Sequence, residues 1–249
     1  MDRLVYDGVS ERDLALRLGV PQVNVFGVVP TTMDIAHAAA EAGAPAGTLI
    51  IAESQAAGRG RGGRRWESQP GRGLWMTLIE RPRSRRGLDV LSLRLGLCAA
   101  EVLDRFAPDG SVTLKWPNDL QVAGRKLAGI LVEARWRDQH VDWVAIGIGL
   151  NVSVPDDVEL AAGLAAGTRR VDVLEAVIPA LRRAAAVEGP FTGEELARYG
   201  VRDVCAGRRI SQPAQGVVAG VAASGELLVD TAAGRVACHG GSLVFAEEG

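Results

Sequence analysis

The densest cluster of positive charge in the sequence is GRGRGGRRW, from Gly58 to Trp66. These nine residues hold four arginines and four glycines and end in a tryptophan. Guanidinium groups form planar forks that match phosphate and carboxylate oxygens. Glycines let backbone N–H groups approach a ligand closely, and an indole offers a face on which a base can stack. The stretch therefore predicts a loop that binds an acid linked to a nucleotide.

Two other interpretations of this loop stay open. One is a flexible, solvated loop, and the other is an RGG-type contact to single-stranded RNA. No GxxxxGK[ST] segment occurs, so a Walker-type phosphate loop is not predicted. Aromatic residues make up 4% of the chain and the formal net charge is −2, whereas single-strand binders need stacking platforms and a basic groove. The nine arginines between Arg59 and Arg86, against two acidic residues, indicate a local site instead.

A second polar cluster is KWPND, from Lys115 to Asp119. Its Trp-Pro pair marks a bend, and the polar side chains around it can bind phosphate or a metal ion. Asp119 suits Mg²⁺, which usually bridges a carboxylate and substrate phosphates; a strand end with a surface aspartate is the plainer alternative. Lys126 then opens the apolar run KLAGILVE. Lysine stems often lie along apolar surface, but an ammonium group inside a pocket would neutralise carboxylate and phosphate.

Both clusters lie at the ends of predicted strands. GTLIIAES (47–54) and GLWMTLIE (73–80) flank the arginine loop, which therefore joins two strands at one end of a sheet. VNVFGVV (23–29) and VDWVAIGIGLNV (141–152) predict further strands, and residues 111–136 predict a strand, a proline bend and a hairpin turning at 123–124. A loop without an apolar anchor is not expected to form a helix or a strand of its own.

Helices are predicted in four places. Thr31 or Thr32 can cap the first, which ends near Gly43. The second covers the sheet over 88–106, and two more fall between 172 and 199. The apolar positions that recur at helical spacing in the second are Leu91, Leu95, Cys98, Val102 and Phe106. After Cys205 short β runs punctuated by glycine, with turns at ASGE and AAGR, predict a separate small β-barrel.

Composition bounds the remaining possibilities. With 249 residues, 47% of them hydrophobic, the chain can form one large domain with an appendage. Three widely spaced cysteines suit a reducing compartment, and no apolar stretch approaches the roughly 20 residues of a membrane helix. About 22 residues precede the first predicted strand, whereas independent domains start at roughly 50 residues. We therefore expect a cytoplasmic, soluble protein without a DNA-binding module in front.

Four ordered segments, GRGRGGRRW, KWPNDL, RKLAGILVE and GIGLNV, resemble the signature segments of the biotin protein ligases. The resemblance is strong from Thr31 to about Val152, and it points to the monofunctional type. It implies an α+β fold, with a mixed β-sheet flanked by helices as in class II aminoacyl-tRNA synthetases. This catalytic domain would span residues 1–205, and a small SH3-like β-barrel would span residues 206–249.

The resemblance also implies a two-step reaction, in which biotin and MgATP form biotinyl-adenylate and a lysine of a biotin carboxyl carrier protein then takes the biotin. Arg61 and Lys126 would be catalytic, and Asp119 would bind Mg²⁺. The implied biotin-binding residues are Thr31, Thr32, Gln55, Gly58, Arg59, Gly60, Arg61, Lys126 and Gly129. The implied nucleotide-binding residues are Arg59, Arg61, Arg64, Trp66, Asn118 and Asn151. The small residues of LAGI and GIG would line a slot for the flat bicyclic ring.

Two departures from the family pattern stand near the site. The usual Ser-Thr-Asn before the first helix is Thr31-Thr32-Met33, and Gly62 replaces a frequent arginine. The closest rival function is a lipoate or octanoate ligase, and an RNA-binding module is the rival from another class. No DNA or membrane partner is expected, and the protein is expected to be a monomer or a weak homodimer.

Overall fold

The computed structural model describes residues 5–156 and 158–246. Its centre is a seven-stranded mixed sheet in the order β3-β4-β5-β9-β8-β7-β6. Only β3 and β4 pair in parallel; every other neighbouring pair is antiparallel. The strands are β3 (Val23–Val29), β4 (Thr48–Gln55), β5 (Gly73–Glu80), β6 (Thr113–Lys115), β7 (Asp119–Val122), β8 (Arg125–Arg137) and β9 (His140–Asn151). The predicted sheet, including the 123–124 turn, is confirmed.

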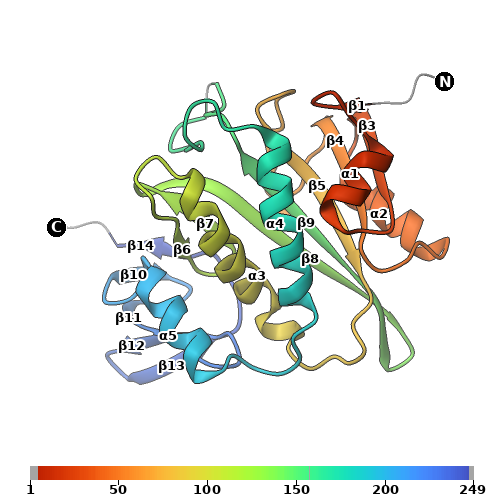
Figure 1. Ribbon diagram of the computed structural model, residues 1–249. Helices are drawn as coiled ribbons and strands as arrows, with labels where there is room; N and C mark the ends of the chain where they lie inside the picture. Colours follow the sequence, from red (N-terminus) through yellow and green to blue (C-terminus); the bar gives the residue numbers. More distant parts are fainter. Residues whose placement is uncertain (1–4, 157, 247–249) are drawn as a thin grey trace.

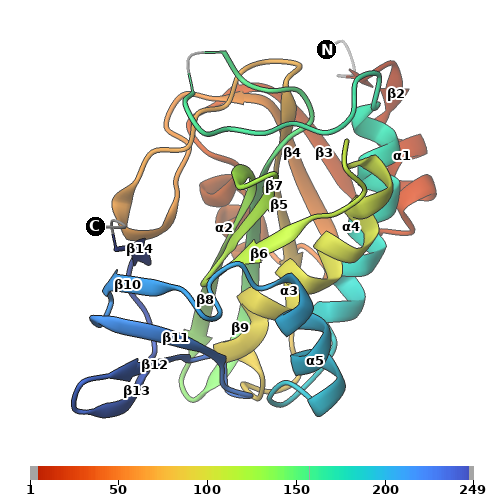
Figure 2. The same ribbon diagram turned by 90° about the vertical axis from the view of Figure 1, so that its left-hand side faces the viewer.

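Helices cover the two faces of this sheet unequally. Helix α2 (Thr32–Glu41) lies alone on one face, while α1 (Glu11–Leu18), α3 (Leu88–Leu103) and α4 (Arg170–Ala185) pack on the other (Figure 2). Along β5, Leu74, Met76 and Leu78 belong to the large core under α3 and α4, whereas Ile79 packs under α2. This strict alternation follows from the two-residue period of a strand, so one residue in two faces the sparsely covered side.

The C-terminal residues form a second sheet of five antiparallel strands, in the order β13-β12-β11-β10-β14. These strands are β10 (Arg209–Gln212), β11 (Gly216–Val221), β12 (Leu227–Thr231), β13 (Gly234–Cys238) and β14 (Val244–Phe245). The sheet lies beside α5 (Gly193–Arg202) and α3, at the lower left of Figure 1. Within the described ranges β13 and β14 do not pair with each other, so closure into a barrel, like the domain boundary at 205, stays a prediction.

The N-terminal segment is more structured than the sequence indicated. A two-stranded ribbon of β1 (Val5–Tyr6) and β2 (Val9–Ser10) leads into α1, whose residues Leu14 and Leu18 are buried in the main core. Ser10 caps α1 by accepting a hydrogen bond from the Asp13 backbone N–H. The sequence pattern did not predict these elements, because they are short and contain too few apolar residues to show a helical or strand periodicity.

Helix α3 is buried on more sides than its predicted apolar stripe. Val90, Leu93, Leu97 and Leu103 are buried in addition, because α4 and α5 pack against the side that the stripe left to solvent. Arg94 of α3 is 1% exposed and donates to both carboxylate oxygens of Glu195, at 2.6 and 3.1 Å. Its guanidinium also donates to the carbonyls of Gly189 and Pro190. This ion pair joins α3 to the start of α5.

Replacing Arg94 by Ala should lower the free energy of unfolding by about 3–5 kcal/mol, because it leaves a largely buried carboxylate without its partner. Arg17→Ala is the matched control: its pair with Glu175 spans 3.6 Å and both side chains are exposed, so the loss should stay within about 1 kcal/mol. Urea denaturation at pH 7 measures both. Equal losses in the two variants would contradict this account.

The same pair has a pH dependence. Hydrogen bonds from Arg94 lower the pKa of Glu195 below its ordinary value. The contribution of the ion pair to the free energy of unfolding is therefore complete above the pKa of Glu195 in the unfolded chain, about 4.3. It is lost as the pH falls through the lower pKa of the folded protein. The stability difference between the native chain and Arg94→Ala should therefore shrink on acidification.

None of the helices in the described ranges is long and apolar enough to cross a membrane.

Candidate active site

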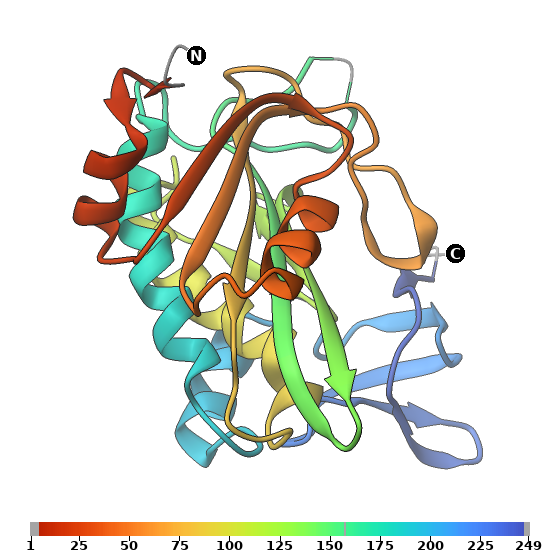
Figure 3. The ribbon, with the colours of Figure 1, turned by 90° about the vertical axis from the view of Figure 1, so that its right-hand side faces the viewer.

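The site lies on the side of the sheet that carries α2 alone, beyond the N-terminus of that helix. Figure 3 shows α2 over the strands, with the segment between β4 and β5 standing next to it. Strand register aligns functional side chains into one row: Lys115 is opposite Asp119, Asp119 opposite Gly129, and Gly129 opposite Gly149. KWPND and the two glycine-containing strands therefore meet because of strand pairing.

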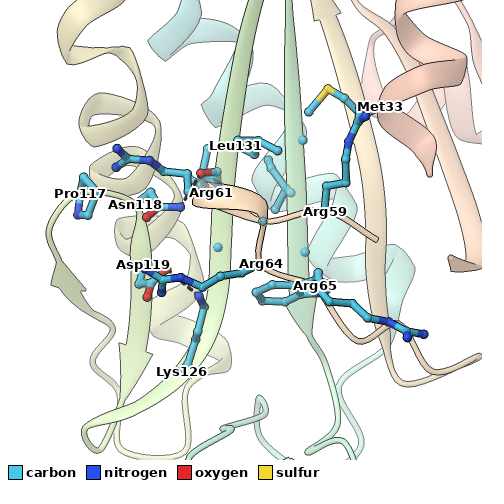
Figure 4. Close-up of a pocket in the computed structure, with 18 of the residues that line it drawn as sticks. Met33, Arg59, Arg61, Arg64, Arg65, Pro117, Asn118, Asp119, Lys126 and Leu131 are labelled. Carbon is cyan, nitrogen blue, oxygen red and sulfur yellow. Dashed lines mark hydrogen bonds and ion pairs between the residues drawn. The ribbon is translucent and has the colours of Figure 1, made fainter. Parts of the chain in front are cut away.

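A cavity of about 330 Å³ lies on this row. The arginine loop covers it from one side, and residues Gly241, Ser242 and Leu243 of the C-terminal segment complete its wall. Figure 4 shows Met33 and Arg59 on one side of the cavity and Asn118, Asp119 and Lys126 on the other. The predicted site residues that line it are Thr31, Thr32, Gln55, Arg59, Gly60, Arg61, Arg64, Trp66, Asn118, Asp119, Lys126 and Gly129.

The arginine loop has a structure of its own, contrary to the expectation for it. Arg59 and Arg65 form an isolated antiparallel bridge, and one turn of 3₁₀ helix, η1 (Arg61–Gly63), closes the tip. The Gly60 N–H donates to the Arg64 carbonyl at 2.7 Å, and the Trp66 N–H donates to the Gly58 carbonyl at 2.9 Å. Backbone pairing across a narrow loop does not need apolar residues, which is why composition missed it.

Glycine is required at two positions of this loop. Gly62 has a φ of 65°, a left-handed conformation that an arginine would adopt only with strain. A Cβ on Gly58 would lie 2.5 Å from the Trp66 carbonyl oxygen. Gly58 is absent from the lining of the cavity, and its observed role is to close the neck of the loop. The biotin contact implied for Gly58 stays a prediction.

The end of the cavity next to α2 carries a chain of polar side chains. Thr31 caps α2 by accepting from the Met33 N–H, as predicted. Thr32 donates to Gln55 Oε1 through its backbone N–H at 2.9 Å, and its hydroxyl lies 2.8 Å from that of Thr77. The Gln55 amide donates in turn to the Ser68 hydroxyl at 3.1 Å. These groups present both donors and acceptors where the helix N-terminus adds positive potential.

The opposite end of the cavity is ionic. Lys126 Nζ lies 2.7 Å from Asp119 Oδ1, and the Lys126 backbone is held by hydrogen bonds to Leu160 and Ala162. Burial and the neighbouring Arg64 lower the pKa of Arg61, which the nearby Asp119 opposes. A guanidinium with a lowered pKa is still charged at neutral pH. Arg64 donates to the Ser242 hydroxyl, which ties the loop to the C-terminal segment.

The cavity as a whole attracts anions. Six basic side chains line it, and among the described lining residues Asp119 is the single carboxylate. Outside the cavity, Arg59 pairs with Asp34 at 2.7 Å. No group of three or more histidine, cysteine or acidic residues in the described ranges could hold a metal ion. One carboxylate fits an Mg²⁺ that arrives with substrate phosphates, because Mg²⁺ keeps most of its other ligands as water and phosphate oxygen.

The glycines expected to leave an open slot are covered. A Cβ on Gly149 would lie 2.3 Å from the Trp66 ring, and a Cβ on Gly147 would lie 2.6 Å from Met33 Cε. Trp66 also lies beneath the Lys126 ammonium group, 5.1 Å from its ring centroid. The small residues do face the site, as predicted, but two large side chains occupy the space they leave.

Two residues that were predicted to contact the nucleotide make hydrogen bonds to backbone carbonyls of the protein. Asn151 is 5% exposed and absent from the cavity lining, and its amide lies 3.4 Å from the Lys126 carbonyl. The Asn118 amide donates to the Ile130 carbonyl at 2.8 Å, and the Ile130 N–H donates back to the Asn118 carbonyl. Asn118 thus fixes the KWPND bend to β8. Lining residues that the sequence did not assign to a site include Met33, Thr77, Leu131 and Ser242.

The sequence model of the Biotin/lipoate A/B protein ligase family matches residues 25–151, the segment that builds the seven-stranded sheet and most of the cavity. The chain belongs to this family. A biotin--[acetyl-CoA-carboxylase] ligase of Mycobacterium tuberculosis is 31% identical over 242 residues, which cover 86% of this chain and 85% of that protein.

Other family members are longer. The bifunctional ligase/repressor BirA of Bacillus subtilis is 37% identical over 163 residues, and the match covers 61% of this chain and 50% of that protein. The chain thus spans about half the length of this relative.

Among solved structures, biotin protein ligase from Aquifex aeolicus in complex with biotin and ATP matches with a TM-score of 0.75 and 25% identity, covering 90% of this chain and 99% of that one. The fold that the resemblance implied, a mixed sheet flanked by helices, is therefore confirmed for this chain.

Arg64→Ala should weaken the binding of inorganic pyrophosphate by about tenfold, the effect of losing one hydrogen bond to a charged group. Arg64 reaches toward Asp119 in Figure 4, whereas Arg65 points away and pairs with Glu67 at 3.4 Å. Arg65→Ala, which removes the same charge, should therefore leave affinity nearly unchanged. Titration calorimetry compares the two. Equal weakening would mean that long-range charge, rather than the position of Arg64, determines affinity.

Proposed function

We propose that this protein is a biotin protein ligase that activates biotin with MgATP and transfers it to a lysine of a biotin carboxyl carrier protein of the acetyl-CoA carboxylase type. The observation that carries the proposal is one cavity with a polar donor–acceptor end beside Thr32 and a cationic end beside Lys126. The Mycobacterium tuberculosis relative is named for this activity. Biotin-dependent exchange of pyrophosphate into ATP is the direct test, and its absence would refute the proposal.

The first step must bring two anions together. At 4 Å two unit charges repel by about 4 kcal/mol at an effective dielectric constant of 20. Arg61, Lys126 and the loop arginines offset this repulsion, so that a carboxylate oxygen can attack the α-phosphorus while the bond to pyrophosphate breaks. Mg²⁺ bound with ATP would neutralise phosphate charge, and Asp119 is the residue suited to hold it. The products are biotinyl-adenylate and pyrophosphate.

The second step passes the acyl group to the carrier protein. The lysine amine attacks the acyl carbon of the mixed anhydride, the carbon–oxygen bond to AMP breaks, and the amine loses a proton as the amide forms. Until then the anhydride must be kept from water. The arginine loop, bridged to Ser242 of the C-terminal segment, is the element that can cover it.

Biotin is favoured over lipoate as the acid. The family includes ligases for both, but the side chains at the α2 end are hydroxyls and an amide, whose donors and acceptors match a ureido group better than a dithiolane ring. Purified protein incubated with ATP, carrier protein and either acid decides between them by the mass of the carrier. A lipoyl adduct without a biotinyl adduct would establish the rival, and RNA binding unaffected by biotin and ATP would revive the RNA-binding hypothesis.

The remaining expectations stay predictions. The cytoplasmic location agrees with the cysteines, which are free in the structure, and with the need for ATP. We expect a monomer or a weak homodimer without a DNA partner. The repressor function named for the longer relatives is not part of this proposal.

Asp119→Asn should spare biotin binding and reduce pyrophosphate exchange by at least tenfold. The amide keeps the size of the side chain but loses the charge that suits Mg²⁺. Calorimetry with biotin alone, run beside the exchange assay, separates the two effects. Comparable loss in both assays would indicate that the ion pair with Lys126 maintains the whole site, and the metal assignment would fall.

Arg61→Gly should form biotinyl-adenylate but release it, because the variant loses a half-buried cation at the ionic end of the cavity. Released adenylate acylates exposed lysines without selection, so bystander protein in the same tube should become biotinylated. An avidin blot measures this, with Arg65→Gly as the control for loop flexibility. Retention of the adenylate as firm as in the native chain would exclude the holding role of Arg61.

A further inference from the structure

The arginine loop is packed against the sheet at its last residue only in part. Trp66 rests over Gly149, but a cavity of about 580 Å³ lies between residues 56–65 and β8, and Glu133 lines its wall. Because apolar packing leaves this space open, charged contacts must hold the loop here. Arg59 makes such contacts, since its guanidinium group pairs with one carboxylate of α2 and one of β8.

The position of Arg59 differs from that of a residue that neutralises substrate charge. Its Nη2 atom lies 2.7 Å from Asp34 Oδ1 and 3.8 Å from Glu133 Oε1. Figure 4 shows the Arg59 side chain beside Met33, on the α2 side of the cavity. Its backbone forms the bridge to Arg65 that closes the loop. The side chain of Arg59 therefore attaches the loop to the protein while its backbone shapes the loop.

Glu133 is itself held by a buried histidine. His37 Nε2 lies 2.9 Å from Glu133 Oε2, and the Trp143 indole donates from Nε1 to His37 Nδ1 at 2.9 Å. An indole nitrogen can only donate, so Nδ1 accepts and the proton of the neutral imidazole lies on Nε2. The Nε2–H therefore donates to Glu133. Trp143 is 8% exposed and His37 is 9% exposed, so the protein core fixes this part of the chain of hydrogen bonds.

The two oxygens of Glu133 have different partners. Oε2 accepts from His37 and lies 3.8 Å from the Arg135 guanidinium, whereas Oε1 faces Arg59. Because buried groups already fix the carboxylate, little further side-chain entropy is lost when it pairs with the loop. The contacts run without a break from Trp143 in the core to Arg59 in the loop, and each donor faces an acceptor.

We propose that Glu133 is a positioning residue for the arginine loop, and that His37 and Trp143 position Glu133. By holding Arg59, the carboxylate keeps residues 59–61 at the α2 end of the cavity, where they form part of its wall. The ligand whose retention depends on this contact is the acid bound at that end. In this respect the inference rests on the proposed function, whereas the anchoring of the loop does not.

Amide hydrogen exchange of the ligand-free protein tests the anchor. Loosening the loop should speed exchange of the Gly60 and Trp66 N–H groups, which donate across it. Glu133→Gln keeps an acceptor for His37 but loses the charge, and should raise both rates about three- to fivefold, the size expected for one partly exposed ion pair. Glu41→Gln, which removes the same charge from an exposed position of α2, should leave both rates unchanged.

A double-mutant cycle shows whether the effect passes through Arg59. Arg59→Ala should speed exchange at least as much as Glu133→Gln, because it also loses the pair with Asp34. Adding Glu133→Gln to Arg59→Ala should then change the rates no further. If the two substitutions instead act independently, Glu133 affects the loop by another route and the proposal is overturned.

A matched pair of substitutions tests the link to His37. His37→Phe and His37→Gln both remove the acceptor of the Trp143 indole, but only glutamine keeps an N–H donor at a reach similar to that of Nε2. Loop exchange should be as fast in His37→Phe as in Glu133→Gln, and close to native in His37→Gln. Equal acceleration in both variants would show that the shape of the ring matters and not its donor, and His37 would lose its positioning role.

Biotin-dependent pyrophosphate exchange gives the functional readout. In Glu133→Gln the KM for biotin should rise about three- to fivefold while kcat stays within about twofold of native, because the acid is held less firmly and the reacting groups are unchanged. An unchanged KM would refute the role in retaining the acid. Absence of activity in the native chain would count against the proposed function alone, since hydrogen exchange without ligand does not depend on it. Circular dichroism confirms that each variant is folded before it is used.

Discussion

The concentration of positive charge in one cavity is the constraint on which the rest of the site depends. Six basic side chains and one carboxylate are among the described lining residues, and the basic side chains repel one another before any substrate arrives. Like charges separate when the backbone allows it. The structure holds them by backbone pairing instead: the loop closes on itself between Arg59 and Arg65, and Lys126 is fixed by hydrogen bonds to two residues of a neighbouring segment.

Room for the substrates comes from the unequal covering of the sheet. Helices α3 and α4 bury one face, while α2 covers the other only in part. Beyond the α2 N-terminus, glycines at Gly129, Gly147 and Gly149 keep the sheet surface free of side chains. Met33 and Trp66 fill the space above them in this structure. Pocket volume is therefore set by which large side chains rest on the glycines as well as by the glycines themselves.

The C-terminal sheet contributes to the site through a few contacts. Ser242 accepts a hydrogen bond from Arg64, and the Trp116 indole donates to the Gly225 carbonyl at 3.1 Å. Phe245 lies under the Lys115 ammonium group at 4.9 Å. Each contact joins this sheet to the arginine loop or to KWPND, so the small sheet supports the ionic end of the cavity, although its own core is small.

The sequence by itself determined the elements with a strong period and the residue types of the site. The strands around the arginine loop, the Thr31 cap and the 123–124 turn follow from local patterns, and GRGRGGRRW with KWPND indicated an anion-binding site. Only the tertiary structure decided which of these residues meet. Strand register aligned Asp119 with Gly129 and Gly149, and packing placed Gly58 at the loop neck, Asn118 against β8 and Trp66 over Gly149. Register and packing depend on contacts between residues far apart in the chain, which local pattern and composition do not encode.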